Sequence, residues 1–145
     1  MADVFDRQTR SRVMSAIRGR NTSPELVVRR FLHSRGLRYS LHGPRLPGRP
    51  DIVLPKWGTV VFVHGCFWHQ HVDCRYAVLP KTNRAFWKAK LLGNQLRDRR
   101  NAARLRLAGW RVLTIWECGL GERGLKRLHQ RIISPSGPAR RALIR

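Results

Sequence analysis

Two short apolar runs in the middle of the chain constrain its fold more than any other feature. Residues 52–54 read Ile-Val-Leu and residues 59–63 read Thr-Val-Val-Phe-Val, with Pro-Lys-Trp-Gly between them. β-branched and aromatic residues favour strands, and a short connection with proline and glycine favours a turn, so the segment predicts a β-hairpin. Both runs are apolar on both faces, which is typical of strands inside a sheet that is covered on each side.

Helical signals lie before the hairpin. Ser23 can cap a helix whose first turn holds Pro24 and Glu25. Gly36 ends this helix after about three turns. A short strand at residues 37–41 is then expected to lead towards the hairpin.

After the hairpin, the chain predicts a long helix from Asn83 to Leu107, a strand at 110–116 and a last helix from Glu122 to Ile133. Because the strand follows a helix, it is expected to run parallel to its neighbour in the sheet. The expected apolar set of the long helix is Phe86, Leu91, Leu92, Leu96, Ala103 and Leu107.

The charge of the chain indicates the class of its partner. Thirty Lys and Arg residues against eight Asp and Glu give a formal net charge of +22 over 145 residues, which is the size of one domain. Such an excess favours a polyanion, and nucleic acid is favoured over a membrane surface because no stretch has the length of a spanning helix. The charged N-terminus lacks the apolar run of a signal peptide, so we expect a cytoplasmic rather than a secreted protein.

An acidic residue stands where the hairpin begins. If the turn at 55–58 is symmetric, Asp51 lies opposite Phe62, and His64 lies diagonally across on the same face. That diagonal is roughly 7–8 Å between backbone positions, which a metal ion or a water molecule can bridge. The alternatives are a turn-capping Asp51 and a packed or solvated His64.

The cysteines suggest a second metal site. Cys66, His71 and Cys74 are spaced Cys-x4-His-x2-Cys, and Cys118 is the one cysteine left to complete a tetrahedral shell for Zn²⁺. An odd count of three cysteines without paired spacing argues against a disulfide framework. Spacing does not distinguish His69 from His71 as the fourth ligand, and three buried thiols with a free histidine remain the alternative.

Several motifs together resemble the very short patch repair endonucleases, a family of the restriction-endonuclease-like superfamily. Pro50-Asp51 with Phe62-Val63-His64 resembles the superfamily's Pro-Asp…(Asp/Glu)-x-Lys motif, and in this family a histidine at the lysine position is expected. Position 63 is valine where threonine can occur, but the family uses the main-chain carbonyl there. The other similar segments are Met14–Arg18, Asn21–Glu25, Pro47–Asp51, His64–His69 and Asn83–Trp87.

The resemblance implies a three-layer α/β/α fold with a central mixed β-sheet, flanking helices and a structural zinc site. Within it we expect a basic N-terminal arm or helix at 1–20, a nuclease domain at 21–133 and a flexible basic tail at 134–145. The implied zinc ligands are Cys66, His71, Cys74 and Cys118.

The resemblance also assigns roles around a catalytic Mg²⁺. Asp51 and the Val63 carbonyl would bind the ion, while His64, Glu25 and Asp98 would act through its waters and His69 would transfer a proton. Helix-surface charges are the alternative for Glu25 and Asp98, and a packed or solvated ring is the alternative for His69. Three rings, Phe67, Trp68 and Trp87, would wedge between base pairs beside a mismatch, although core packing is the usual role of such rings.

The implied function is a strand-specific, Mg²⁺-dependent endonuclease that nicks DNA 5′ to the thymine of a T:G mispair and starts very short patch repair of deaminated 5-methylcytosine. A restriction-type or junction nuclease of the same fold and a zinc-stabilised DNA-binding protein without catalysis are the alternatives. The expected partner is double-stranded DNA with a T:G mismatch, and repair-pathway proteins are candidate partners. We expect a monomer in the bacterial cytoplasm, associated with the nucleoid.

Overall fold

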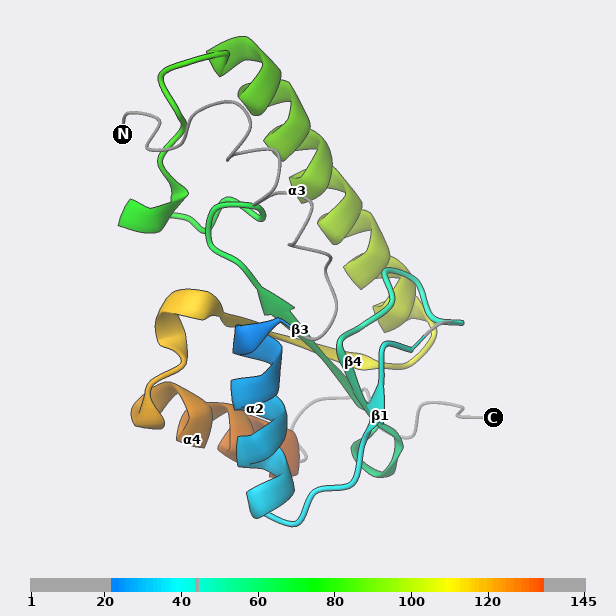
Figure 1. The fold of residues 1–145 in the computed structure, drawn as a ribbon. Helices are drawn as coiled ribbons and strands as arrows, with labels where there is room; N and C mark the ends of the chain where they lie inside the picture. The colour runs from blue at the N-terminus through cyan, green and yellow to red at the C-terminus, as the bar shows by residue number, and fades with distance from the viewer. Residues whose placement is uncertain (1–21, 44, 135–145) are drawn as a thin grey trace.

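A computed structural model of the chain describes residues 22–43 and 45–134 (Figure 1). Within these residues the strands form one mixed sheet in the order β1-β2-β3-β4. They are β1 (Ser40–Leu41), β2 (Ile52–Leu54), β3 (Thr59–His64) and β4 (Arg111–Trp116). The expected arm at 1–20, with its Met14–Arg18 motif, and the expected tail beyond residue 134 lie outside the described residues.

The predicted hairpin is confirmed. Strands β2 and β3 pair antiparallel, with Ile52 opposite Val61 and Leu54 opposite Thr59. A 3₁₀ turn at Pro55–Trp57 joins them, and Gly58 follows it in the left-handed region at φ 60°, which glycine adopts at little cost. This register, extended by one residue, places Asp51 opposite Phe62 as predicted.

Strand β3 has a second partner on its other side. It pairs parallel with β4 from Thr59↔Arg111 to His64↔Trp116, which confirms the predicted parallel strand. β3 therefore lies in the interior of the sheet, as its apolar sequence on both faces requires.

Helices cover both faces of the sheet (Figure 1). Helices α2 (Ser23–Ser34) and α4 (Glu122–Ile133) lie on one face, and α3 (Arg84–Leu107) lies on the other. One core lies beneath α2 and α4 and contains Val28, Leu32, Ile52, Leu54, Val61, Leu113, Ile115, Leu125, Leu128 and Ile132. A smaller core on the α3 side contains Val53, Val60, Leu105 and Trp110. This three-layer α/β architecture is consistent with the restriction-endonuclease-like fold.

Two local predictions near the N-terminal helix are corrected. Thr22, not Ser23, is the N-cap of α2, and its hydroxyl accepts a hydrogen bond from the Glu25 N–H at 3.4 Å. The strand predicted at 37–41 is limited to Ser40–Leu41, since Leu37 turns into the main core instead.

The bounds of the long helix were predicted to within one residue, but most of its expected apolar set was wrong. Only Leu91 of that set is buried, whereas Leu107 is 89% exposed and Phe86 is 58% exposed. Leu105 packs against the sheet and Trp87 packs against the loop that follows β3. The helix thus has two different partners along its length. Its buried residues Trp87, Leu91 and Leu105 lie on one face, but the polar side chains of Asn94 and Asp98 interrupt the apolar pattern of that face. None of the described helices has the length and apolar character needed to cross a membrane.

Replacing Leu32 by alanine tests the larger core. The fully buried Leu32 side chain packs between α2 and the sheet, so Leu32→Ala should lower the free energy of unfolding by about 2–5 kcal/mol. Leu107→Ala is the matched control, and at its exposed position the change should stay within about 0.5 kcal/mol. Urea unfolding of both variants measures the difference, and equal losses would contradict the core assignment.

Candidate functional site

An open groove of about 1450 Å³ lies where α2, the end of β3, the following loop and α3 meet. Its lining includes all six of the expected catalytic and magnesium positions: Glu25, Asp51, Val63, His64, His69 and Asp98. These residues come from positions far apart in the sequence, and the fold brings them to one side of the molecule.

Asp51 is held against the end of β3. Its Oδ2 accepts a hydrogen bond of 2.7 Å from the main-chain N–H of Val63. In an antiparallel ladder the N–H and C=O of one residue face the same neighbour, so the Val63 carbonyl also faces the side on which Asp51 lies. A carboxylate and a carbonyl on one side of a strand are the oxygen ligands that Mg²⁺ prefers.

Burial perturbs the Asp51 carboxyl strongly. Desolvation raises the pKa of Asp51 from 3.8 to about 6, against the lowering effect of the Val63 N–H. The nearby charge of Glu25 contributes to this rise in pKa, while His42 and His69 oppose it. A bound cation would reverse this penalty by favouring the ionised form.

His64 and His69 stack as parallel rings beside Asp51. Their centroids are 3.7 Å apart and their planes differ by 2°. The pKa of His64 is lowered from 6.5 to about 4, mainly by burial and also by the neighbouring His69, against the raising effect of Asp98. His64 is therefore neutral at pH 7, and its buried Nδ1 has no hydrogen-bond partner among the described residues. A buried ring nitrogen of this kind fits a site completed by water, an ion or substrate.

Asp98 on α3 orients His69. The distance from His69 Nδ1 to Asp98 Oδ2 is 2.6 Å. An ionised carboxylate only accepts hydrogen bonds, so Nδ1 carries the proton and Nε2 is left to exchange one. The structure therefore places Asp98 behind His69, and the predicted action of Asp98 through metal-bound water stays a prediction.

Glu25 is buried in the first turn of α2, with 2% of its surface exposed. It contacts the hydroxyl of Thr22 at 3.2 Å, the guanidinium of Arg29 at 3.0 Å and Nε2 of His42 at 3.1 Å. Arg29 and His42 were not among the site residues predicted from the sequence. Arg29 had a detectable signal, since it lies four residues after Glu25 on a predicted helix, whereas His42 had none.

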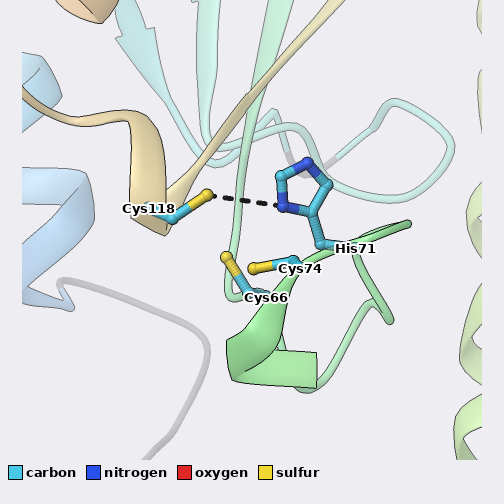
Figure 2. Close-up of side chains that lie close together, drawn as sticks. All are labelled: Cys66, His71, Cys74 and Cys118. Carbon is cyan, nitrogen blue, oxygen red and sulfur yellow. Dashed lines mark hydrogen bonds between the residues drawn. The ribbon is translucent and has the colours of Figure 1, made fainter. Parts of the chain in front are cut away.

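The four expected zinc ligands lie close together (Figure 2). The ligand atoms of Cys66, His71, Cys74 and Cys118 all lie within 4.8 Å of one another, and Cys118 Sγ is 3.4 Å from His71 Nδ1. The parallel β3–β4 pairing ends at His64 and Trp116, and Cys66 and Cys118 each lie two residues beyond these strand ends. The cluster can hold a metal ion. The structure also separates the two candidate histidines, because His71 joins the thiols while His69 joins Asp98.

The three expected wedge rings form one cluster. Phe67 contacts Trp68 at 5.1 Å and Trp87 at 5.5 Å between centroids. Asn94 of α3 donates a hydrogen bond to the Trp68 carbonyl at 3.0 Å, which ties this loop to the helix. Trp87 is only 6% exposed and lies behind the more exposed Phe86. Phe67 and Trp68 thus lie nearer the solvent than Trp87, whose insertion into DNA stays a prediction.

Comparison with known proteins gives one family model and several similar sequences. The family model described as "DNA mismatch endonuclease Vsr" matches residues 2–76. The chain is 45% identical to "DNA mismatch endonuclease Vsr" of Escherichia coli strain K12 over 128 residues, which cover 88% of this chain and 80% of the relative. It is 44% identical over 137 residues to "Type II nicking enzyme V.XorIIP" of Xanthomonas oryzae pv. oryzae, covering 94% of this chain and all of the relative. It is 43% identical to "Type II nicking enzyme V.NmeAIP" of Neisseria meningitidis over 88% of this chain and 90% of the relative.

The shifted pKa values of Asp51 and His64 act on stability in opposite directions. Because Asp51 binds its proton more tightly in the folded state, its contribution to stability is present below pH 3.8 and is lost as the pH rises through about 6. His64 binds its proton more weakly in the folded state, so its contribution is present above pH 6.5 and is lost as the pH falls through about 4.

Asp51→Asn removes only the first of these effects. Without Mg²⁺, the variant should be more stable than the parent at pH 7, and this advantage should shrink by about 1–3 kcal/mol at pH 4. Urea unfolding at several pH values measures it, with Asp73→Asn at an exposed position as the matched control. A stability difference that does not change with pH would contradict a buried carboxyl with a raised pKa.

Proposed function

The chain belongs to the DNA mismatch endonuclease Vsr family and is a DNA endonuclease, and on this premise we propose that it nicks one strand of DNA 5′ to the thymine of a T:G mispair. The nick requires Mg²⁺ and starts very short patch repair of deaminated 5-methylcytosine. The observation that carries the proposal is the meeting of Asp51, the Val63 main chain, His64 and the His69–Asp98 pair in one groove.

Asp51 and the Val63 carbonyl would hold the magnesium ion. When bound, Mg²⁺ supplies the charge that polarises the scissile phosphate and activates water. Glu25 and neutral His64 would hydrogen-bond the waters of its hydration shell. His69 would move a proton through Nε2 while Asp98 keeps its ring in the required tautomer.

The ring cluster supports selectivity for a mispair. Phe67 and Trp68 lie on the loop beside the groove, and Trp68 itself lines it. Inserting side chains into a base stack costs a few kcal/mol per step, and that cost is lowest where pairing is already weak. Trp87 would support these rings from behind or join them once DNA is bound.

The Cys/His cluster is proposed to bind a structural Zn²⁺. Three thiolates and one imidazole complete a tetrahedral shell without an open position, so the ion would stabilise the loop rather than perform chemistry. This loop carries His69 and two of the wedge rings, Phe67 and Trp68, and its stability therefore bears on catalysis and on recognition.

The asymmetry of the mispair and the net charge of the chain complete the proposal. A T:G mispair has no two-fold symmetry for a dimer to match, so the enzyme would act as a monomer. Its charge of +22 would provide phosphate contacts that position the duplex without reading its sequence.

An assay with end-labelled duplexes tests this function. With Mg²⁺ present, the enzyme should nick only the strand that carries the mispaired thymine of a T:G duplex, and it should leave the matched duplex intact. Cutting of both duplexes would favour a restriction-type or junction nuclease. The relatives named Type II nicking enzymes are a reason to test this alternative. Binding without cutting would favour a DNA-binding protein without catalysis.

Asp51→Ala serves as the catalytic variant in the same assay. Loss of the carboxylate ligand removes several kcal/mol of transition-state stabilisation, so the nicking rate should fall by at least about a thousandfold. The affinity for DNA should stay close to that of the parent, as should both properties of the matched control Glu122→Ala, which removes an exposed carboxylate at the start of α4. Full nicking by Asp51→Ala would refute the metal site.

Replacing Cys118 tests the zinc site separately. Cys118→Ser removes one of the four ligands, so zinc measured by atomic absorption should fall clearly below one ion per chain and the melting temperature should drop. His129→Ala on α4, away from the cluster, should retain the zinc. An unchanged zinc content in Cys118→Ser would exclude this cysteine as a ligand.

A further inference from the structure

His42 contacts two of the acidic residues that line the groove, Glu25 and Asp51. Its ring nitrogen Nε2 lies 3.1 Å from Glu25 Oε1, and its main-chain N–H donates a hydrogen bond of 3.1 Å to the carbonyl oxygen of Asp51. The ring therefore reaches α2 while the backbone is tied to the residue that precedes β2. One residue thus connects the two elements that carry Glu25 and Asp51.

The backbone of His42 has an unusual conformation. Its φ is 52°, in the left-handed region that non-glycine residues seldom adopt. Such a conformation costs of order 1 kcal/mol or more and persists only where the surroundings hold it. Here the tie to Asp51 and the contact with Glu25 hold it, and the ring lines the groove.

Glu25 needs such a partner. A buried carboxylate must be hydrogen-bonded to remain ionised, and the side chain of Glu25 is almost completely covered. Thr22 and Arg29 contact it from its own helix, so they fix it only relative to α2. His42 approaches from the sheet side and fixes Glu25 relative to Asp51.

We propose that His42 is a positioning residue of the metal site, which sets the distance between Glu25 and Asp51 and so pre-organises the groove for a divalent ion. The inference rests on the proposed function, because it assigns Glu25 to the hydration shell of the ion. Partners that orient groups around a metal typically change metal affinity by 10–100-fold when they are removed.

Two variants separate the role of the ring from that of the backbone. His42→Ala removes the contacts of ring nitrogen Nε2 with Glu25 and with the Arg29 guanidinium, which lies 3.3 Å away. His42→Gln restores a side-chain amide at about the same reach, which can donate to Glu25 or accept from Arg29, and both variants bear a similar backbone cost at positive φ. His33→Ala, at an exposed position near the end of α2, is the matched histidine control.

The measurement is the Mg²⁺ concentration that gives half-maximal nicking of a T:G duplex. It should rise roughly tenfold in His42→Ala and return to within about twofold of the parent in His42→Gln, while the rate at saturating Mg²⁺ changes by less than about threefold. His33→Ala should behave like the parent. An unchanged Mg²⁺ requirement in His42→Ala, or a His42→Gln variant as impaired as His42→Ala, would overturn the proposal.

A second readout does not depend on nicking. Mn²⁺ bound to the protein–duplex complex, measured by electron paramagnetic resonance, should show the same order of affinity among the parent and the three variants. If the parent binds Mn²⁺ but nicks no duplex, the proposed function fails while the order of affinities still tests His42. If the parent binds no Mn²⁺, both proposals fail.

Discussion

The pairing of β3 on both of its edges is the constraint on which the rest of this structure depends. On one edge, the antiparallel register with β2 places Asp51 beside the main chain of Val63. On the other edge, the parallel register with β4 brings Trp116 beside His64 and places Cys66 and Cys118 each two residues beyond the paired strand ends. A slip of one residue on either edge would turn side chains to the opposite face. Both the groove and the Cys/His cluster therefore depend on this register.

The Cys/His cluster and the groove are also joined by a series of rings. His71 of the thiol cluster stacks on Trp116 at 4.1 Å, and Trp116 meets His64 edge-on at 5.1 Å. His64 in turn stacks on His69. The loop that carries the cysteines therefore reaches the groove by side-chain packing as well as through its backbone, and a metal ion in the cluster would hold rings of the proposed catalytic site in place.

Burying the polar groups of the groove is costly, and the structure offsets the cost with local partners. Asp51 accepts the Val63 N–H, Glu25 has Thr22, Arg29 and His42, and His69 has Asp98. His64 is different, because burial keeps it neutral and its Nδ1 is without a partner in the described part of the chain. The groove thus combines a closely held set of carboxylates with a buried, neutral imidazole, an arrangement suited to binding a cation and phosphate oxygens.

The sequence by itself determined the hairpin, the last helix at Glu122–Ile133, the spacing of the metal-binding residues and, by resemblance, the family, because each of these depends on residues close in sequence or on a fixed motif. It did not determine which side chains of α3 are buried, that Thr22 caps α2, or that His42 meets Glu25 across 17 positions of the chain. The buried residues of α3 share one face, but Asn94 and Asp98 lie on that face and line the groove, so its apolar pattern is interrupted and hydrophobic periodicity favoured another face. Only the tertiary structure decided these contacts, since burial and long-range hydrogen bonds depend on which surfaces meet once the layers have packed.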